Sequence, residues 1–168
     1  EEDSFTIYKK LRKINKAPFS AYLNFNDFQI ISSSPERFIQ IKERIAHTRP
    51  IKGTRPRGSS AEEDERNKLE LINSEKDKAE LLMIVDLERN DFSKVCKAGT
   101  VKVKELFALE EYATVFHLVS TIEGELEDNI SAVKVMEECF PGGSITGAPK
   151  IRAMEIIEEL EGLKRNIY

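Results

Sequence analysis

The segment that organises this sequence is residues 50–58, which read PIKGTRPRG. It places Lys52 among Arg49, Arg55 and Arg57, between a proline and a glycine, and we interpret it as a loop. A lysine that acts as a nucleophile must be uncharged, and neighbouring cations favour the loss of its proton. The positive charges of these four side chains would also bind a small molecule with several negative charges. The residues therefore leave two interpretations open: a reactive amine, or a basic loop that binds any phosphate or carboxylate.

The composition limits the class of protein. The chain has 168 residues, close to one domain, and 40% of them are hydrophobic. A net charge of −4 argues against a nucleic-acid partner, which usually needs a basic domain or stripe. Cys96 and Cys139 fit no metal or redox spacing and are typical of reduced cysteines. The chain has neither a membrane-length apolar run nor a basic N-terminal signal, so we expect a cytoplasmic protein without membrane contact.

Hydrophobic periodicity and turn residues predict the secondary structure. We expect helices over residues 4–14, 59–71, 74–91, 131–139 and 149–160, and strands over residues 19–25, 28–32, 38–41, 44–48, 101–107 and 114–122. Residues 81–85 are apolar on every side of their helix, so we expect them to be buried. Many strands follow one another without crossover helices, which predicts an α+β fold.

Two polar side chains stand in apolar surroundings. Glu80 precedes the apolar run of its helix, where a carboxylate needs a partner. That partner is either a magnesium ion or a salt bridge to Lys76 or Lys78; the third alternative is a side chain simply exposed at the helix start. His117 shares one face of its strand with valines, so it is either a catalytic group or a core histidine with a satisfied hydrogen bond.

Residues 141–149, PGGSITGAP, form a loop of small residues that leads into a helix. The loop is not a phosphate-binding loop of the usual kind, because Ala148 and Pro149 stand where that motif needs lysine and serine or threonine. It is either an anion site at a helix N-terminus or a tight packing loop. Glu36 follows Ser34-Pro35, where a strand ends and a side chain can point into a cleft.

Taken in order, five motifs resemble those of the chorismate-utilising enzymes. They are SPERF at 34–38, PIKGTRPRG at 50–58, AELLMIVDLERND at 79–91, VFHLVS at 115–120 and PGGSITGAPK at 141–150. Their order and spacing fit the family as well. The resemblance implies a mostly antiparallel two-sheet core with outer helices, of which residues 1–168 would form a partial catalytic domain.

Within that family, anthranilate synthases carry alanine at the position of Lys52, whereas component I of the aminodeoxychorismate synthases carries lysine. The resemblance therefore implies a transferase in which Lys52 attacks C2 of chorismate and the C4 hydroxyl leaves. Ammonia then enters at C4 and expels the lysine, which gives 4-amino-4-deoxychorismate for p-aminobenzoate and folate synthesis. Anthranilate, salicylate and isochorismate synthases are the alternatives within the family.

The same resemblance implies roles for other residues. Glu80 would bind Mg²⁺, Glu36 would act as a general acid or base, and His117 would lie against the substrate ring. The substrate oxygens would be bound by Gly53, Thr54 and Thr146.

The resemblance also implies a partner and a longer parent chain. Related enzymes receive ammonia from a glutamine amidotransferase subunit. The family's catalytic domain is longer than this chain, so we expect a piece cut at both ends that is inactive by itself and self-associates through unpaired strand edges. A non-catalytic domain that binds small acids or a protein is the alternative from another class. The joint presence of Lys52, Glu80, His117 and Glu36 argues against it.

Overall fold

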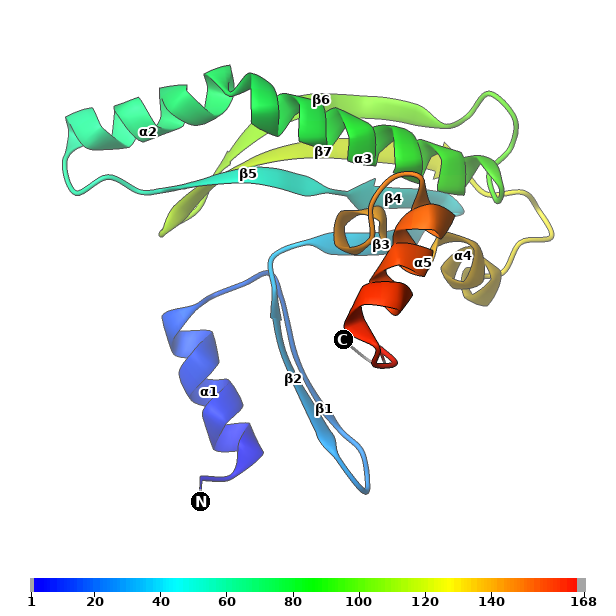
Figure 1. Ribbon diagram of the computed structural model, residues 1–168, viewed down its shortest axis with the longest axis horizontal. Coiled ribbons are helices and arrows are strands. Elements are labelled where there is room, and N and C mark those ends of the chain that lie inside the picture. Colours follow the sequence, from blue (N-terminus) through cyan, green and yellow to red (C-terminus); the bar gives the residue numbers. More distant parts are fainter. Residues whose placement is uncertain (1, 166–168) are drawn as a thin grey trace. The chain divides into compact units, whose positions relative to one another are not determined.

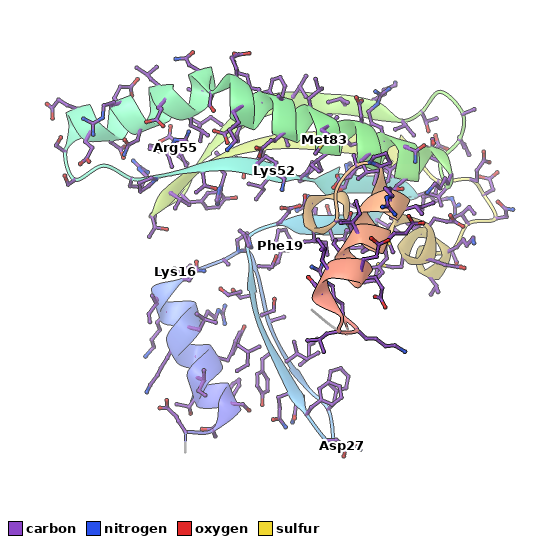
Figure 2. The ribbon with its side chains drawn as sticks, in the orientation of Figure 1. Lys16, Phe19, Asp27, Lys52, Arg55 and Met83 are labelled. Carbon is purple, nitrogen blue, oxygen red and sulfur yellow. The ribbon has the colours of Figure 1, made fainter. Side chains whose placement is uncertain are left out.

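The computed structural model describes residues 2–165, and it divides into two compact units, one that ends at Arg37 and one that begins at Phe38. The first unit holds α1 (Ser4–Ile14), β1 (Phe19–Asn24) and β2 (Gln29–Ser34). The two predicted strands pair antiparallel in a hairpin, whose turn includes Asp27 (Figure 2).

The first unit is held together by a small aromatic cluster. The ring of Tyr22 on β1 lies 5.2 Å from that of Phe5 and 5.8 Å from that of Tyr8, both on α1. Asp3 caps the helix, since its carboxylate accepts the backbone N–H groups of Phe5 and Thr6 at 3.1 Å. The helix therefore begins at Ser4, the first residue of the expected range.

The second unit contains the remaining elements (Figure 1). They are β3 (Arg37–Lys42, whose first residue ends the first unit), β4 (Ile45–Arg49), β5 (Ile51–Pro56), α2 (Ala61–Asn73), α3 (Glu75–Ser93), β6 (Lys102–Glu111), β7 (Val115–Glu125), α4 (Ala132–Cys139), η1 (Gly143–Ile145) and α5 (Lys150–Glu161). The helices and antiparallel sheets confirm the predicted α+β class.

Strand β7 organises the five-stranded sheet. β4 and β5 follow one another along one edge of β7, interrupted at Pro50, and β6 pairs with the other edge. Helices α2 and α3 lie along one face of this sheet (Figure 1). The core forms there, where Phe116, Leu118 and Ile122 of β7 join one cluster with buried residues of both helices. The long buried strand therefore fixes the elements that carry the sequence motifs.

Two expectations about local structure were wrong. Residues 51–56 form strand β5 rather than a loop, because their backbone groups pair with β7, far along the chain. The apolar run of α3 is not buried on every side: Leu81, Ile84 and Val85 are buried, whereas Leu82 and Met83 are each 44% exposed. Only one side of a helix can face the sheet it packs against. Between residues 2 and 165, no helix combines the length and the apolar character needed to cross a membrane.

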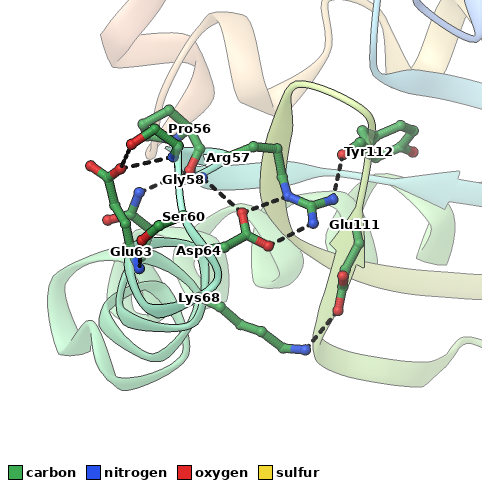
Figure 3. Close-up of polar contacts among 11 residues, drawn as sticks. Pro56, Arg57, Gly58, Ser60, Glu63, Asp64, Lys68, Glu111 and Tyr112 are labelled. Carbon is green, nitrogen blue, oxygen red and sulfur yellow. Dashed lines mark hydrogen bonds and ion pairs between the residues drawn. The ribbon is translucent and has the colours of Figure 1, made fainter.

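A cluster of polar contacts fixes the start of α2 (Figure 3). Arg57 donates two parallel hydrogen bonds to the carboxylate of Asp64, at 2.8 and 2.6 Å. The N–H of Gly58 donates to the same carboxylate at 2.7 Å, and Arg57 also donates to the carbonyl of Tyr112 at 3.0 Å. These hydrogen bonds, those from Arg57 first, lower the pKa of Asp64 from 3.8 to about 2. The cluster joins α2 to the turn that precedes β7.

Replacing Asp64 with asparagine is expected to lower the free energy of unfolding at neutral pH. The folded state depresses the pKa of Asp64. The ionised carboxylate therefore contributes fully to the stability of the fold above about pH 4, and this contribution is lost as the pH falls through about 2. Urea unfolding of both proteins over a pH series measures the effect. The difference between them should shrink on acidification. Glu65→Gln on the same helix is the control, and an equal loss in the two variants would contradict this assignment.

Candidate active site

Lys52 lies on β5, where its backbone pairs opposite Leu118 of β7 (Figure 2). Its ammonium nitrogen Nζ donates a hydrogen bond to the backbone carbonyl of Ser144 at 3.3 Å. Ser144 belongs to η1, within the small-residue loop. The structure thus brings together two motifs that lie far apart in the chain, since Lys52 and Ser144 are separated by 92 positions.

A β-bulge at Gly53 sets the direction of the neighbouring side chains. Lys52 pairs opposite Leu118 and Thr54 opposite His117, so Gly53 has no partner in the ladder, and its φ is +79°. A Cβ at this position would lie 2.8 Å from Cδ1 of Leu71. Both the backbone conformation and the close approach of α2 therefore require glycine here.

His117 is buried on β7, and its Nδ1 lies 2.9 Å from the hydroxyl oxygen of Thr54. The ring of Tyr112 meets it edge-on at 5.5 Å. Burial lowers the pKa of His117 below its usual 6.5, although the Glu110 carboxylate and a backbone hydrogen bond with Gly53 act in the opposite direction. The imidazole is therefore neutral at neutral pH, with its orientation fixed by Thr54.

The arginines near Lys52 do not act as free cations. Each forms an ion pair: Arg49 with Glu110, Arg55 with Glu70 and Asp77, and Arg57 with Asp64. Their charges are largely offset by these carboxylates. The sequence-based argument that treats them as free cations beside Lys52 is therefore not supported. Arg55 joins β5 to α2 and α3, Arg57 joins the residues after β5 to α2, and Arg49 joins β4 to β6.

The loop of small residues packs tightly, as one of its two interpretations required. Gly142 approaches the ring of Phe38, so a Cβ there would lie 3.3 Å from ring carbons. The hydroxyl of Thr146 donates to the carbonyl of Gly142 at 3.1 Å, within the loop itself. A contact of Thr146 with substrate remains a prediction. Pro149 is the N-cap of α5 rather than its first residue.

Glu80 lies on α3 with a side chain that is 47% exposed, and its carboxylate is 3.8 Å from Nζ of Lys76. This is the salt bridge named as the alternative to a metal. In the range 2–165, no group of three or more histidine, cysteine and acidic side chains could hold a metal ion. One exposed carboxylate still fits Mg²⁺, which usually takes one or two carboxylates and completes its shell with substrate oxygens and water.

Glu36 belongs to the first unit, in the bend between β2 and β3. Its backbone N–H donates to the hydroxyl of Ser34, and that hydroxyl donates to its carbonyl, both at 3.3 Å. Lys52, Thr54, His117 and Thr146 all belong to the second unit. The structure brings Lys52 to the loop and Thr54 to His117, while the role of Glu36 remains a prediction.

Sequence reasoning missed a buried ion pair beside the loop. Asp91 of α3 is 3% exposed and pairs with Lys150, the first residue of α5. The burial of Asp91 had a signal in the sequence, because Asp91 shares a helix face with Ile84, but its partner Lys150 had none. Glu88 was missed as well: it is 7% exposed and accepts a hydrogen bond from the Thr48 hydroxyl at 2.9 Å.

The two cysteines are free, as the sequence predicted, and both are buried. Burial raises the pKa of Cys96 to about 11 and that of Cys139 to about 12. Both thiols are therefore protonated at neutral pH. They act as small core residues and offer no thiolate nucleophile.

Comparison with known proteins agrees with the motifs. The family described as chorismate binding enzyme matches residues 1–168. Aminodeoxychorismate synthase component 1 of Bacillus subtilis is 52% identical over 164 residues, which cover 98% of this chain and 35% of that protein. Anthranilate synthase component 1 of Saccharolobus solfataricus is 51% identical over 166 residues, 99% of this chain and 39% of that protein.

Solved structures show the same fold. Anthranilate synthase component I of Streptococcus pneumoniae superposes with a TM-score of 0.87 at 36% identity, over 100% of this chain and 37% of that one. The chain thus spans little more than a third of the length of the relatives from Bacillus subtilis, Salmonella typhimurium and Streptococcus pneumoniae. Matched over its whole length by the family and by relatives at about half identity, the chain belongs to the chorismate binding enzymes.

Proposed function

We propose that this chain is the chorismate-binding part of an aminodeoxychorismate synthase component 1, which aminates chorismate at C4. The observation that carries the proposal is Lys52 itself. It stands at the position that distinguishes this branch of the family, on a strand paired with β7, with its amine hydrogen-bonded to the motif loop. Relatives with this name are 52% identical in Bacillus subtilis and in Salmonella typhimurium.

The proposed reaction begins with the neutral amine of Lys52, which bonds to C2 of chorismate as the ring double bonds shift. The C4 hydroxyl leaves as water, with a proton from Glu36, because hydroxide is a poor leaving group. Ammonia then bonds to C4, the ring double bonds shift back, and the amine of Lys52 leaves C2. The product is 4-amino-4-deoxychorismate, and the nucleophile is regenerated.

The other residues bind and orient the substrate in this proposal. Glu80 would hold Mg²⁺, which when bound neutralises the ring carboxylate. The neutral imidazole of His117, oriented by Thr54, would lie against the ring without adding charge. Gly53, Thr54 and Thr146 would bind substrate oxygens. Ammonia would come from a glutamine amidotransferase subunit in the cytoplasm, and the product would serve folate synthesis.

Anthranilate synthase is the second candidate. It is favoured by the 51% identity to the enzyme of Saccharolobus solfataricus and by the superposition on that of Streptococcus pneumoniae. Overall similarity therefore does not separate the two activities. Lys52 is the residue that does, because amination at C2 has no need of a lysine bonded to that carbon.

Product analysis tests the proposal. The complete subunit that contains this chain is incubated with chorismate, Mg²⁺ and ammonium, and the products are identified by chromatography and mass spectrometry. We expect 4-amino-4-deoxychorismate, and no turnover from the 168-residue chain alone. Anthranilate as the main product would support the second candidate. Chorismate binding that is independent of Mg²⁺, without any product, would indicate a non-catalytic domain.

A further inference from the structure

Asp91, near the C-terminal end of α3, forms ion pairs with two lysines. One partner is Lys150, whose side chain is 13% exposed, and the other is Lys94, whose side chain is 44% exposed. A charge in a protein interior needs a partner, because burial removes its hydration. Asp91 and Lys150 therefore depend on one another, whereas Lys94 can be solvated by water in the absence of Asp91.

Lys150 also joins the two ends of the motif loop. Its Nζ donates to the backbone carbonyl of Cys139 at 3.1 Å. Cys139 is the last residue of α4 and Lys150 is the first residue of α5, so the segment between them is residues 140–149. One ammonium group thus ties both ends of this 140–149 loop to the carboxylate on α3.

Between its ends the 140–149 loop packs closely on α3. A Cβ on Gly143 would lie only 2.9 Å from Cδ2 of Leu87. The cavity lined by α3, β3, β4 and the loop has a volume of about 10 Å³, which holds no more than about one water molecule. The loop is therefore packed against α3 at Gly143, with no larger space between the two at that point.

The 140–149 loop carries the hydrogen-bond acceptor for Lys52, which is the carbonyl of Ser144 at 3.3 Å. The hydroxyl of Ser144 is buried and, within the described residues, has no hydrogen-bond partner. The backbone carbonyl is therefore the group through which the loop contacts the lysine, and its position depends on the path of the loop backbone.

We propose that Lys150 is a positioning residue. Its buried pair with Asp91 fixes the 140–149 loop on α3, and through the carbonyl of Ser144 the loop fixes the amine of Lys52. The importance of this position of the Lys52 amine for catalysis rests on the proposed function, whereas the role of Lys150 in fixing that position is independent of it. The lysine that ends PGGSITGAPK and the aspartate that ends LERND thus position the amine without contacting it.

The test measures the accessibility of each lysine amine in the 168-residue chain. A brief pulse of acetic anhydride is followed by digestion and mass spectrometry, which gives a labelling rate for each lysine. The variants are Lys150→Met and the matched control Lys94→Met, which removes the exposed partner of the same carboxylate. Lys68 on α2, with a side chain 31% exposed, reports any general loosening of the unit.

We expect Lys150→Met to change the labelling rate of Lys52 severalfold while Lys68 stays constant, and Lys94→Met to change neither. An unchanged Lys52 in folded Lys150→Met would overturn the proposal, as would an equal change in both variants. If Lys150→Met fails to fold, Asp91→Leu combined with Lys150→Met removes the unpaired buried charge, and its Lys52 rate must then show the same severalfold change.

This test is independent of the chemistry proposed for Lys52, because it uses no chorismate. A subunit that forms no product but shows the labelling change would refute the proposed function and retain the positioning role. A subunit that makes 4-amino-4-deoxychorismate, with a Lys52 labelling rate that does not change in Lys150→Met, would support the proposed function and refute the positioning role.

Discussion

Replacing Lys52 with alanine is expected to abolish the synthesis of 4-amino-4-deoxychorismate by the complete subunit. The variant has no amine to bond to C2, so ammonia has no activated C4 to enter. Loss of a covalent nucleophile lowers the rate by a factor on the order of 10³ or more. With C2 left open, ammonia can attack that carbon directly, and we expect anthranilate to appear as the residual product.

The matched control for this variant is Lys42→Ala, which removes an exposed lysine of β3. Product identity and rate are measured for both variants at one concentration of chorismate, Mg²⁺ and ammonium. Lys42→Ala should behave as the unchanged enzyme. A Lys52→Ala enzyme that still makes 4-amino-4-deoxychorismate at full rate would refute the role given to this residue.

Replacing Gly53 with alanine is expected to have the largest effect on stability. The new Cβ would require a φ of +79° and would lie 2.8 Å from Leu71 and 2.9 Å from Asp77. Strain at positive φ costs about 1–2 kcal/mol and overpacking a further 1–3, so we expect a loss of roughly 3 kcal/mol. Urea unfolding of the chain measures this loss.

Gly99→Ala separates the two causes. Gly99 has a φ of +77°, nearly that of Gly53, but a Cβ there would meet nothing within 4 Å. This variant should lose only the backbone part, about 1 kcal/mol. Equal losses in the two variants would show that the close approach of α2 to the bulge contributes nothing.

Local patterns in the sequence predicted much of the fold. The strands β1 and β2 and the helix α2 were expected from such patterns, and the hydroxyl of Ser60 accepts the N–H of Glu63 at 3.2 Å at the start of α2. Such signals involve residues that are close in the chain. The motifs in turn predicted the family, because several short segments in the right order are specific in combination.

Features that depend on distant partners could not be predicted in the same way. Residues 51–56 resemble a loop until β7 supplies hydrogen bonds to their backbone. The cations of Arg49, Arg55 and Arg57 appear unopposed until the fold brings carboxylates to them. The buried pair of Asp91 and Lys150 joins residues 59 positions apart, and neither residue alone indicates the other.

The central claim is that the amine of Lys52 bonds to a carbon of chorismate, and intact mass spectrometry tests it most directly. The complete subunit is incubated with chorismate and Mg²⁺ in the absence of ammonia, so that the intermediate cannot be released. We predict a mass increase equal to chorismate minus one water, mapped by peptide analysis to Lys52 and absent from Lys52→Ala. A subunit that is active with ammonia but never gains this mass would contradict the account.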